Sequence, residues 1–161
     1  MIKKIYLDMD GVLCNFEKKY VELFGKEPAV ADRNRKEWST NWDKFCQENY
    51  FEKLDWFPGA HVLLDYVKRT NITVEILSSS GGKKYHDIVE ASKKKWLKEH
   101  NIPYKANIVP GRAHKTAYAT PETVLIDDTP DIIEAFNKAD GHGILHKDVS
   151  QTIKKLDILL R

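Results

Sequence analysis

The chain has 161 residues, of which 42% are hydrophobic, 11% aromatic and 31% charged. This length predicts one domain and argues against a second of full size. The 26 basic and 24 acidic residues give a formal net charge of +2, too little for an overall field that would attract nucleic acid or a membrane surface. The first residues hold no apolar signal core and no apolar run approaches the roughly 18 residues of a membrane span, so we expect a cytoplasmic protein.

Short apolar runs that end at polar or turn residues predict five strands, at 3–7, 74–77, 107–109, 124–126 and 143–145. Segments with helical periodicity follow at 60–69, 86–99, 131–138 and 149–160. Strands that alternate with helices predict an α/β fold with a doubly wound, largely parallel sheet covered on both faces. Active sites in such sheets lie beyond the carboxyl ends of the strands.

Residues 15–58 break this rhythm, because they hold many aromatic and charged residues and no strand-like run. They predict a small helical cap insert that ends at Pro58-Gly59. The catalytic core is then expected to comprise residues 1–14 and 59–161.

Two other groups of residues have simple structural interpretations. Cys14 and Cys46 lack metal-site spacing, so we expect reduced, packed thiols. Acidic residues interleave with a lysine-rich stretch, which we interpret as a solvated helix face. Its members are Lys83, Lys84, Lys93, Lys94, Lys95 and Lys98.

Two pairs of acidic residues follow predicted strands. Asp8 and Asp10 come directly after the first, and Gly11 permits a turn or a close approach to a ligand. An ordinary Asp-Gly turn is the alternative. Asp127 and Asp128 follow the strand at 124–126, where the alternative is a cap for a helix that opens at Pro130.

A parallel sheet would gather these four carboxylates in one small volume. Two like charges about 4 Å apart repel by about 4 kcal/mol at an effective dielectric near 20, so the cluster needs a cation. Ligands that are all oxygen favour Mg²⁺. We therefore predict a magnesium site.

Ser78 and Ser79 follow the strand at 74–77, where their hydroxyls and nearby backbone amides are suited to an anion. The tract is not a nucleotide-binding P-loop, because Leu77 stands where that motif requires glycine. Lys115 lies in a Gly-Arg-Ala-His-Lys segment that leads toward Asp127. Taken alone, it is an ordinary surface lysine.

Taken together, the motif at 8–13, Ser78, Lys115 and the acidic pair before Pro130 resemble the four signature motifs of the haloacid dehalogenase (HAD) superfamily of phosphotransferases. The segments at 8–13, 16–17, 57–60 and 125–131 are most similar to the 5'(3')-deoxyribonucleotidases.

The resemblance implies a role for each residue that matches a motif. Asp8 is the expected nucleophile and Asp10 the general acid and base. Mg²⁺ is expected on Asp8, the backbone carbonyl of Asp10, and Asp128, with Asp127 sharing the ion or ordering its water. The expected phosphate ligands are Gly11, Ser78, Ser79 and Lys115.

The expected function is hydrolysis of nucleoside monophosphates by a Mg²⁺-dependent phosphomonoesterase. Phe16 matches a base-contacting phenylalanine of the deoxyribonucleotidases, and Trp38 and Trp42 are four residues apart, on one face if helical. These three rings are expected either to stack on a base or to form the insert's own core. Two other functions stay open: action on another phosphate, such as a nucleic-acid 3'-end or a small metabolite, and non-enzymatic binding of phosphate or metal.

Overall fold

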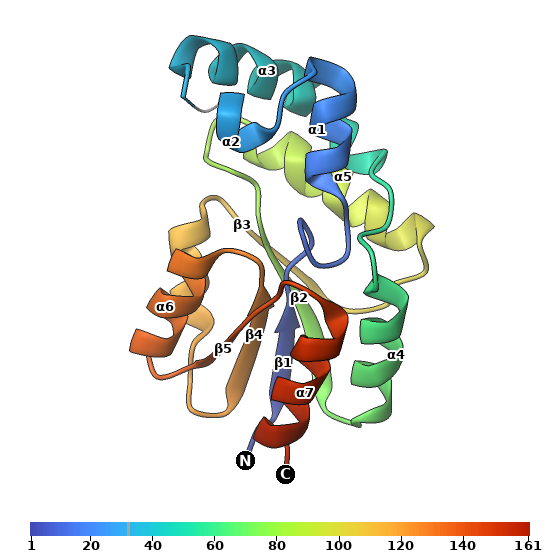
Figure 1. Cartoon of the computed structure of the whole chain (residues 1–161), viewed down its shortest axis with the longest axis vertical. Coiled ribbons are helices and arrows are strands. Elements are labelled where there is room, and N and C mark those ends of the chain that lie inside the picture. Colours follow the sequence, from blue (N-terminus) through green and yellow to red (C-terminus); the bar gives the residue numbers. More distant parts are fainter. Residues whose placement is uncertain (32) are drawn as a thin grey trace.

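The computed structural model describes residues 1–31 and 33–161 and contains a five-stranded parallel sheet (Figure 1). The strand order is β3-β2-β1-β4-β5, so the chain winds outward from β1 in both directions. This confirms the predicted doubly wound α/β sheet and puts the end of β1 at the switch point, where such sheets bind ligands. The strands are β1 (Lys4–Leu7), β2 (Thr73–Ser79), β3 (Ala106–Val109), β4 (Thr123–Asp127) and β5 (His142–Leu145).

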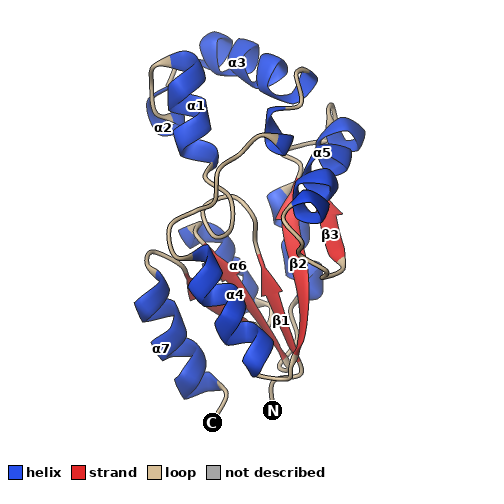
Figure 2. Ribbon diagram, turned by 90° about the vertical axis from the view of Figure 1, so that its right-hand side faces the viewer, coloured by secondary structure: helices blue, strands red, loops and turns tan. Residues whose placement is uncertain are grey.

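Helices cover both faces of the sheet, as Figures 1 and 2 show. Side chains from α4 (Ala60–Arg69), α5 (His86–Glu99) and α7 (Val149–Leu159) share one core with Ile5 and Leu7. Side chains from α6 (Pro130–Lys138) and from the 3-10 helix η2 (Arg112–Tyr118) share a second core with Tyr6. The two cores form because successive residues of a strand point to opposite faces.

Two strands continue beyond the carboxyl ends of the predicted runs. β2 continues to Ser79 because pairing with β3 continues there, and β4 continues to Asp127, which pairs with Leu145. The sequence does not predict η2, because Arg112–Tyr118 has no apolar periodicity.

Four helical segments lie between β1 and α4, beyond the carboxyl ends of the strands (Figure 2). Asn15 and Asn34 begin two of them by accepting hydrogen bonds from backbone amides. Aromatic rings in mutual contact form the interior of this region. The division into an insert at 15–58 and a core at 1–14 and 59–161 stays a prediction. The segments are α1 (Phe16–Phe24), α2 (Pro28–Ala31), α3 (Arg35–Gln47) and η1 (Tyr50–Glu52).

Cys14 and Cys46 are buried free thiols, which confirms their interpretation as packing residues. In the described part of the chain, no helix combines the length and apolar character needed to cross a membrane.

Candidate active site

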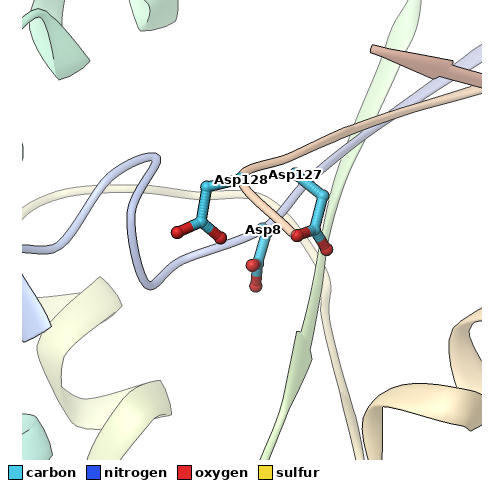
Figure 3. Close-up of side chains that lie close together, drawn as sticks. All are labelled: Asp8, Asp127 and Asp128. Atoms are coloured by element: carbon cyan, nitrogen blue, oxygen red, sulfur yellow. The ribbon is translucent and has the colours of Figure 1, made fainter. Parts of the chain in front are cut away.

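Three carboxylates meet where β1 and β4 end (Figure 3). Leu7 pairs with Ile126, so the next residues along the two strands, Asp8 and Asp127, are neighbours. One oxygen from each of Asp8, Asp127 and Asp128 lies within 4.8 Å of the other two. Asp8 and Asp127 are buried, whereas Asp128 is exposed. The sheet register therefore brings Asp8 to the second acidic pair.

Lys115 lies among these carboxylates. It comes from η2, is 3% exposed, and its Nζ lies 3.2 Å from Asp8 Oδ1 and 2.7 Å from Asp127 Oδ2. Burial alone would lower the pKa of the Lys115 ammonium, but the two carboxylates raise it above its ordinary value. The alternative interpretation, an ordinary surface lysine, is wrong.

The cluster still carries more negative than positive charge. Burial and the neighbouring Asp127 raise the pKa of Asp8 to about 8. Loss of solvent around its carboxyl group, again with Asp127, raises the pKa of Asp128 to about 6. Clustered carboxylate oxygens are the ligands that Mg²⁺ takes in proteins, so these residues fit a divalent cation.

Hydrogen bonds distinguish the two acids of the second pair. Both oxygens of Asp127 have partners, since Oδ2 accepts from Lys115 and Oδ1 accepts from the Thr129 amide at 3.0 Å. Asp128 Oδ1 accepts from the Thr129 hydroxyl at 3.3 Å, and no hydrogen bond to Oδ2 is found among the described residues. Asp128 is therefore better placed than Asp127 to give an oxygen to a cation.

The structure does not leave the Gly11 amide available for phosphate, although we expect Gly11 to be a phosphate ligand. Its amide donates to the Cys14 carbonyl at 2.9 Å, so this amide is already used within the protein. Its φ is +79°, and a Cβ at this position would lie 2.0 Å from Asp128 Oδ2. Only glycine allows this conformation together with this close approach, so Gly11 makes room for the Asp128 carboxylate.

Asp10 lies beside the cluster and lines the same pocket. Its Oδ2 accepts a hydrogen bond from Lys93 at 2.9 Å. Its Oδ1 is buried and has no hydrogen-bond partner in residues 1–31 and 33–161. A buried oxygen without a partner is costly, which favours a partner supplied by substrate or water.

The two serines at the end of β2 point to opposite faces of the sheet, as successive strand residues do. Ser79 lines the pocket, and its hydroxyl oxygen accepts from the Gly81 amide at 3.0 Å. Ser78 is 0% exposed, and its hydroxyl accepts from Lys93 at 2.7 Å. Of these two serines, Ser79 lines the pocket and Ser78 is not among the lining residues.

A pocket of about 1220 Å³ separates the edge of the sheet from the helical segments above it. Phe16, Trp38 and Trp42 line this pocket. The same rings pack on their neighbours: Phe16 is stacked on Phe51 with centroids 5.7 Å apart, and Trp38 on Trp42 at 5.8 Å. The expected shared helix face of the two tryptophans is confirmed. These rings both line the pocket and form part of the insert's core.

Sequence reasoning missed Lys93. It places this lysine on a solvated face, but Lys93 is 1% exposed and donates hydrogen bonds to Asp10 and Ser78. Val89, Lys93 and Trp96, spaced by four and three, form one helix stripe, and both apolar members are 0% exposed. That spacing was the available signal. Lys94 and Lys95 do extend into solvent.

The charged edge and the match to a 5' nucleotidase family define a class: the protein is a phosphoric monoester hydrolase, and its fold is that of haloacid dehalogenase superfamily structures. The chain belongs to the family described as 5' nucleotidase, deoxy (pyrimidine), cytosolic type C protein, which matches residues 1–153. No curated protein matches the chain.

Solved structures share the fold at low sequence identity. A HAD-superfamily hydrolase from Ehrlichia chaffeensis is 16% identical, with 99% of this chain and 98% of that chain covered and a TM-score of 0.56. For a hydrolase from Streptococcus pneumoniae TIGR4 the identity is 16%, the coverage 97% and 98%, and the TM-score 0.57. The D,D-heptose 1,7-bisphosphate phosphatase from Burkholderia thailandensis is 11% identical, with 99% of both chains covered and a TM-score of 0.57.

Proposed function

We propose that the protein hydrolyses nucleoside monophosphates through an aspartyl-phosphate on Asp8, with Mg²⁺ as its cofactor. One observation carries this proposal: Asp8, Asp10 and Lys115 stand together at one end of a pocket that aromatic rings line from the other side. The family match to a 5' nucleotidase supports the substrate class.

In the first step, a carboxylate oxygen of Asp8 attacks the phosphorus atom. The bond between phosphorus and the nucleoside oxygen breaks, and a proton from Asp10 Oδ1 passes to that oxygen. Lys115 and the Ser79 hydroxyl would hold the phosphoryl oxygens. Asp10 lines the pocket beside Asp8, which supports its assignment as the group that meets the leaving oxygen.

In the second step, Asp10 Oδ1 takes a proton from water, and the resulting hydroxide attacks the aspartyl-phosphate. The bond between phosphorus and Asp8 breaks, so inorganic phosphate leaves and both carboxyl groups return to their starting states. Asp8 and Asp128, with the backbone carbonyl of Asp10, would hold Mg²⁺, which when bound screens the charge of the phosphate.

The nucleoside is expected to lie against the insert, with its base on the rings of Phe16, Trp38 and Trp42. The pocket is large enough to hold such a ligand, since ligand pockets commonly measure about 300–1,000 Å³.

The test measures inorganic phosphate released from p-nitrophenyl phosphate and from a panel of nucleoside 5'- and 3'-monophosphates, with Mg²⁺ and with EDTA. We expect release that needs Mg²⁺ and is abolished in Asp8→Asn. Asp65→Asn, an exposed site on α4, is the matched control and should keep wild-type activity.

Turnover by Asp8→Asn at the wild-type rate would end the aspartyl-phosphate proposal. Activity on p-nitrophenyl phosphate with none on any nucleotide would end the nucleotidase proposal and leave a phosphatase for another substrate.

A further inference from the structure

We propose that Lys93 is a positioning residue that fixes the Asp10 carboxyl group for the catalytic proton transfers. This inference rests on the proposed function, because it assigns Asp10 the proton transfers described above. Lys93 comes from α5, on the face of the sheet opposite to η2, which provides Lys115.

The side chain of Lys93 is enclosed and fully bonded. Its Nζ donates to Asp10 Oδ2 at 2.9 Å, to Ser78 Oγ at 2.7 Å and to the Ser79 carbonyl at 2.8 Å. An ammonium has three donors, so these bonds use all of them. Lys93 therefore has no donor left for phosphate, which separates its role from that of Lys115.

A buried ammonium group such as that of Lys93 is stable only if the groups around it compensate for its lost hydration. Lysine is almost never fully buried unless it is paired, and removing charge from water is costly. The aromatic ring of Phe51 adds a further contact, with Nζ 4.9 Å from its centroid. The Lys93 ammonium group thereby contacts three parts of the chain: the end of β2, Asp10 in the segment after β1, and the insert.

The Lys93 ammonium group determines which oxygen of the Asp10 carboxyl group can carry a proton. Because an ammonium only donates, the Oδ2 atom that it holds must accept, and a proton on the Asp10 carboxyl group must then lie on Oδ1. Oδ1 is the buried oxygen without a partner among the described residues. The Lys93 contact thus fixes which oxygen of the Asp10 carboxyl group carries the acidic proton.

The same ammonium supports the neighbouring phosphate site less directly. It binds the Ser79 carbonyl and the Ser78 hydroxyl from behind, while the Ser79 hydroxyl lines the pocket. Lys93 could in principle act through this second route, by placing Ser79 against phosphate. The two routes differ in what they predict for substrates with different leaving groups.

A proton from Asp10 matters most when the leaving oxygen is strongly basic. The hydroxyl of a nucleoside is a poor leaving group and needs the proton, whereas p-nitrophenolate leaves with little help. A loss of phosphate binding would weaken both reactions alike, because the phosphoryl group is the same. The ratio of kcat/KM for a nucleoside monophosphate to kcat/KM for p-nitrophenyl phosphate therefore reports on the placement of Asp10.

The decisive variant is Lys93→Met, which keeps the length of the side chain and removes its donors. We expect kcat/KM for a nucleoside 5'-monophosphate to fall by about 10²–10⁴-fold, the usual range for general acid–base help, and kcat/KM for p-nitrophenyl phosphate to fall less than about tenfold. Competitive inhibition by inorganic phosphate should change less than about threefold, because the phosphate site is intact. Lys94→Met, next along α5 and exposed, should match the wild type in all three measurements.

Equal losses on both substrates, or weaker inhibition by phosphate in proportion to the loss of activity, would overturn the inference in favour of the Ser79 route. If melting shows that Lys93→Met is unfolded, Lys93→Arg serves instead, because it keeps charge and donors but changes their geometry. The same substrate-dependent loss is expected from Lys93→Arg, and equal losses would again overturn the inference. Failure of the proposed function is seen separately, as absence of nucleotide hydrolysis by the wild type.

Discussion

The carboxyl edge of the sheet and the helical insert above it form one pocket by opposite physical means. At the edge, charged groups are buried in fixed pairs, as with Lys115 between Asp8 and Asp127. In the insert, aromatic rings contact one another over many geometries, from stacked to edge-on.

These two kinds of packing respond differently to change. Breaking a buried ion pair leaves a charge without its partner and typically costs about 3–5 kcal/mol. A single aromatic contact contributes only about 0.5–1.5 kcal/mol beyond area burial, and neighbouring rings replace part of it. We therefore expect changes at the edge to affect turnover of every phosphate ester, and changes in the insert to affect which ester binds.

Among Lys115→Met, Asp128→Ala and Phe16→Ala, the largest effect on turnover should come from Lys115→Met. It removes the ammonium that offsets two buried carboxylates and that would hold the phosphoryl group, so kcat should fall about 10²–10³-fold on both nucleotides and p-nitrophenyl phosphate. Steady-state kinetics on both substrates measures this, with the exposed Lys138→Met on α6 as the control. A loss confined to nucleotides would contradict the division of roles between edge and insert.

Within the edge, Asp128→Ala should weaken Mg²⁺ binding more than Asp127→Ala does. Asp128 has an oxygen without a partner among the described residues, whereas both oxygens of Asp127 are already bonded. The half-saturating Mg²⁺ concentration should rise about 10- to 100-fold in Asp127→Ala, the range known for groups that support metal ligands, and by more in Asp128→Ala, which loses a direct ligand. Titration of activity with Mg²⁺ decides the order, and equal or reversed shifts would refute it.

In the insert, Phe16→Ala should raise KM for nucleotides about 5- to 150-fold, since stacking of a base on an aromatic ring is worth about 1–3 kcal/mol. KM for p-nitrophenyl phosphate should stay near the wild-type value. Equal losses on both substrates together with a lower Tm would make Phe16 a core residue only. No loss on either substrate would remove the base contact from this position.

The contrast between the two regions also explains how much could be predicted from sequence. Asp8 and the pair Asp127-Asp128 each follow a short apolar run, and a parallel sheet brings the ends of its strands together. Local pattern and topology together were therefore enough to predict the acidic cluster. That Phe16 both lines the pocket and packs within the aromatic cluster was not predictable in this way, because the sequence does not tell how rings of separate helices are arranged around a pocket.

Two features of the edge were not predictable from sequence, for a similar reason. The side of the sheet on which a strand's last residue points depends on register, so Ser78 and Ser79 could not be told apart from sequence alone. Lys93 follows an apolar spacing on its helix, but the exposed lysines directly after it give the whole tract the appearance of a solvated face. In both cases the sequence identifies the type of residue but not the direction in which its side chain points.

The last prediction concerns stability and compares the two regions through pH. In the metal-free protein, burial and the charge of Asp127 raise the pKa of Asp8 from about 3.8 to about 8. Between these values the folded protein keeps a proton that the unfolded chain has released, so its free energy of unfolding falls as pH rises from about 4 to about 8 and then levels off. Asp8→Asn cannot ionise, so its Tm in EDTA should fall less over this range and exceed that of the wild type at pH about 8.

An insert variant provides the opposite case. Phe45→Leu replaces one ring of the aromatic cluster with a smaller aliphatic side chain and should lower Tm by a similar amount at every pH, since no titrating group is lost. Mg²⁺ should raise the wild-type Tm more at pH about 8 than at pH about 5, because protons compete with the ion for the same carboxylates. Parallel Tm curves for the wild type and Asp8→Asn in EDTA would show that the buried carboxylate does not govern stability in this range. The charged edge would then be no more sensitive to pH than the insert.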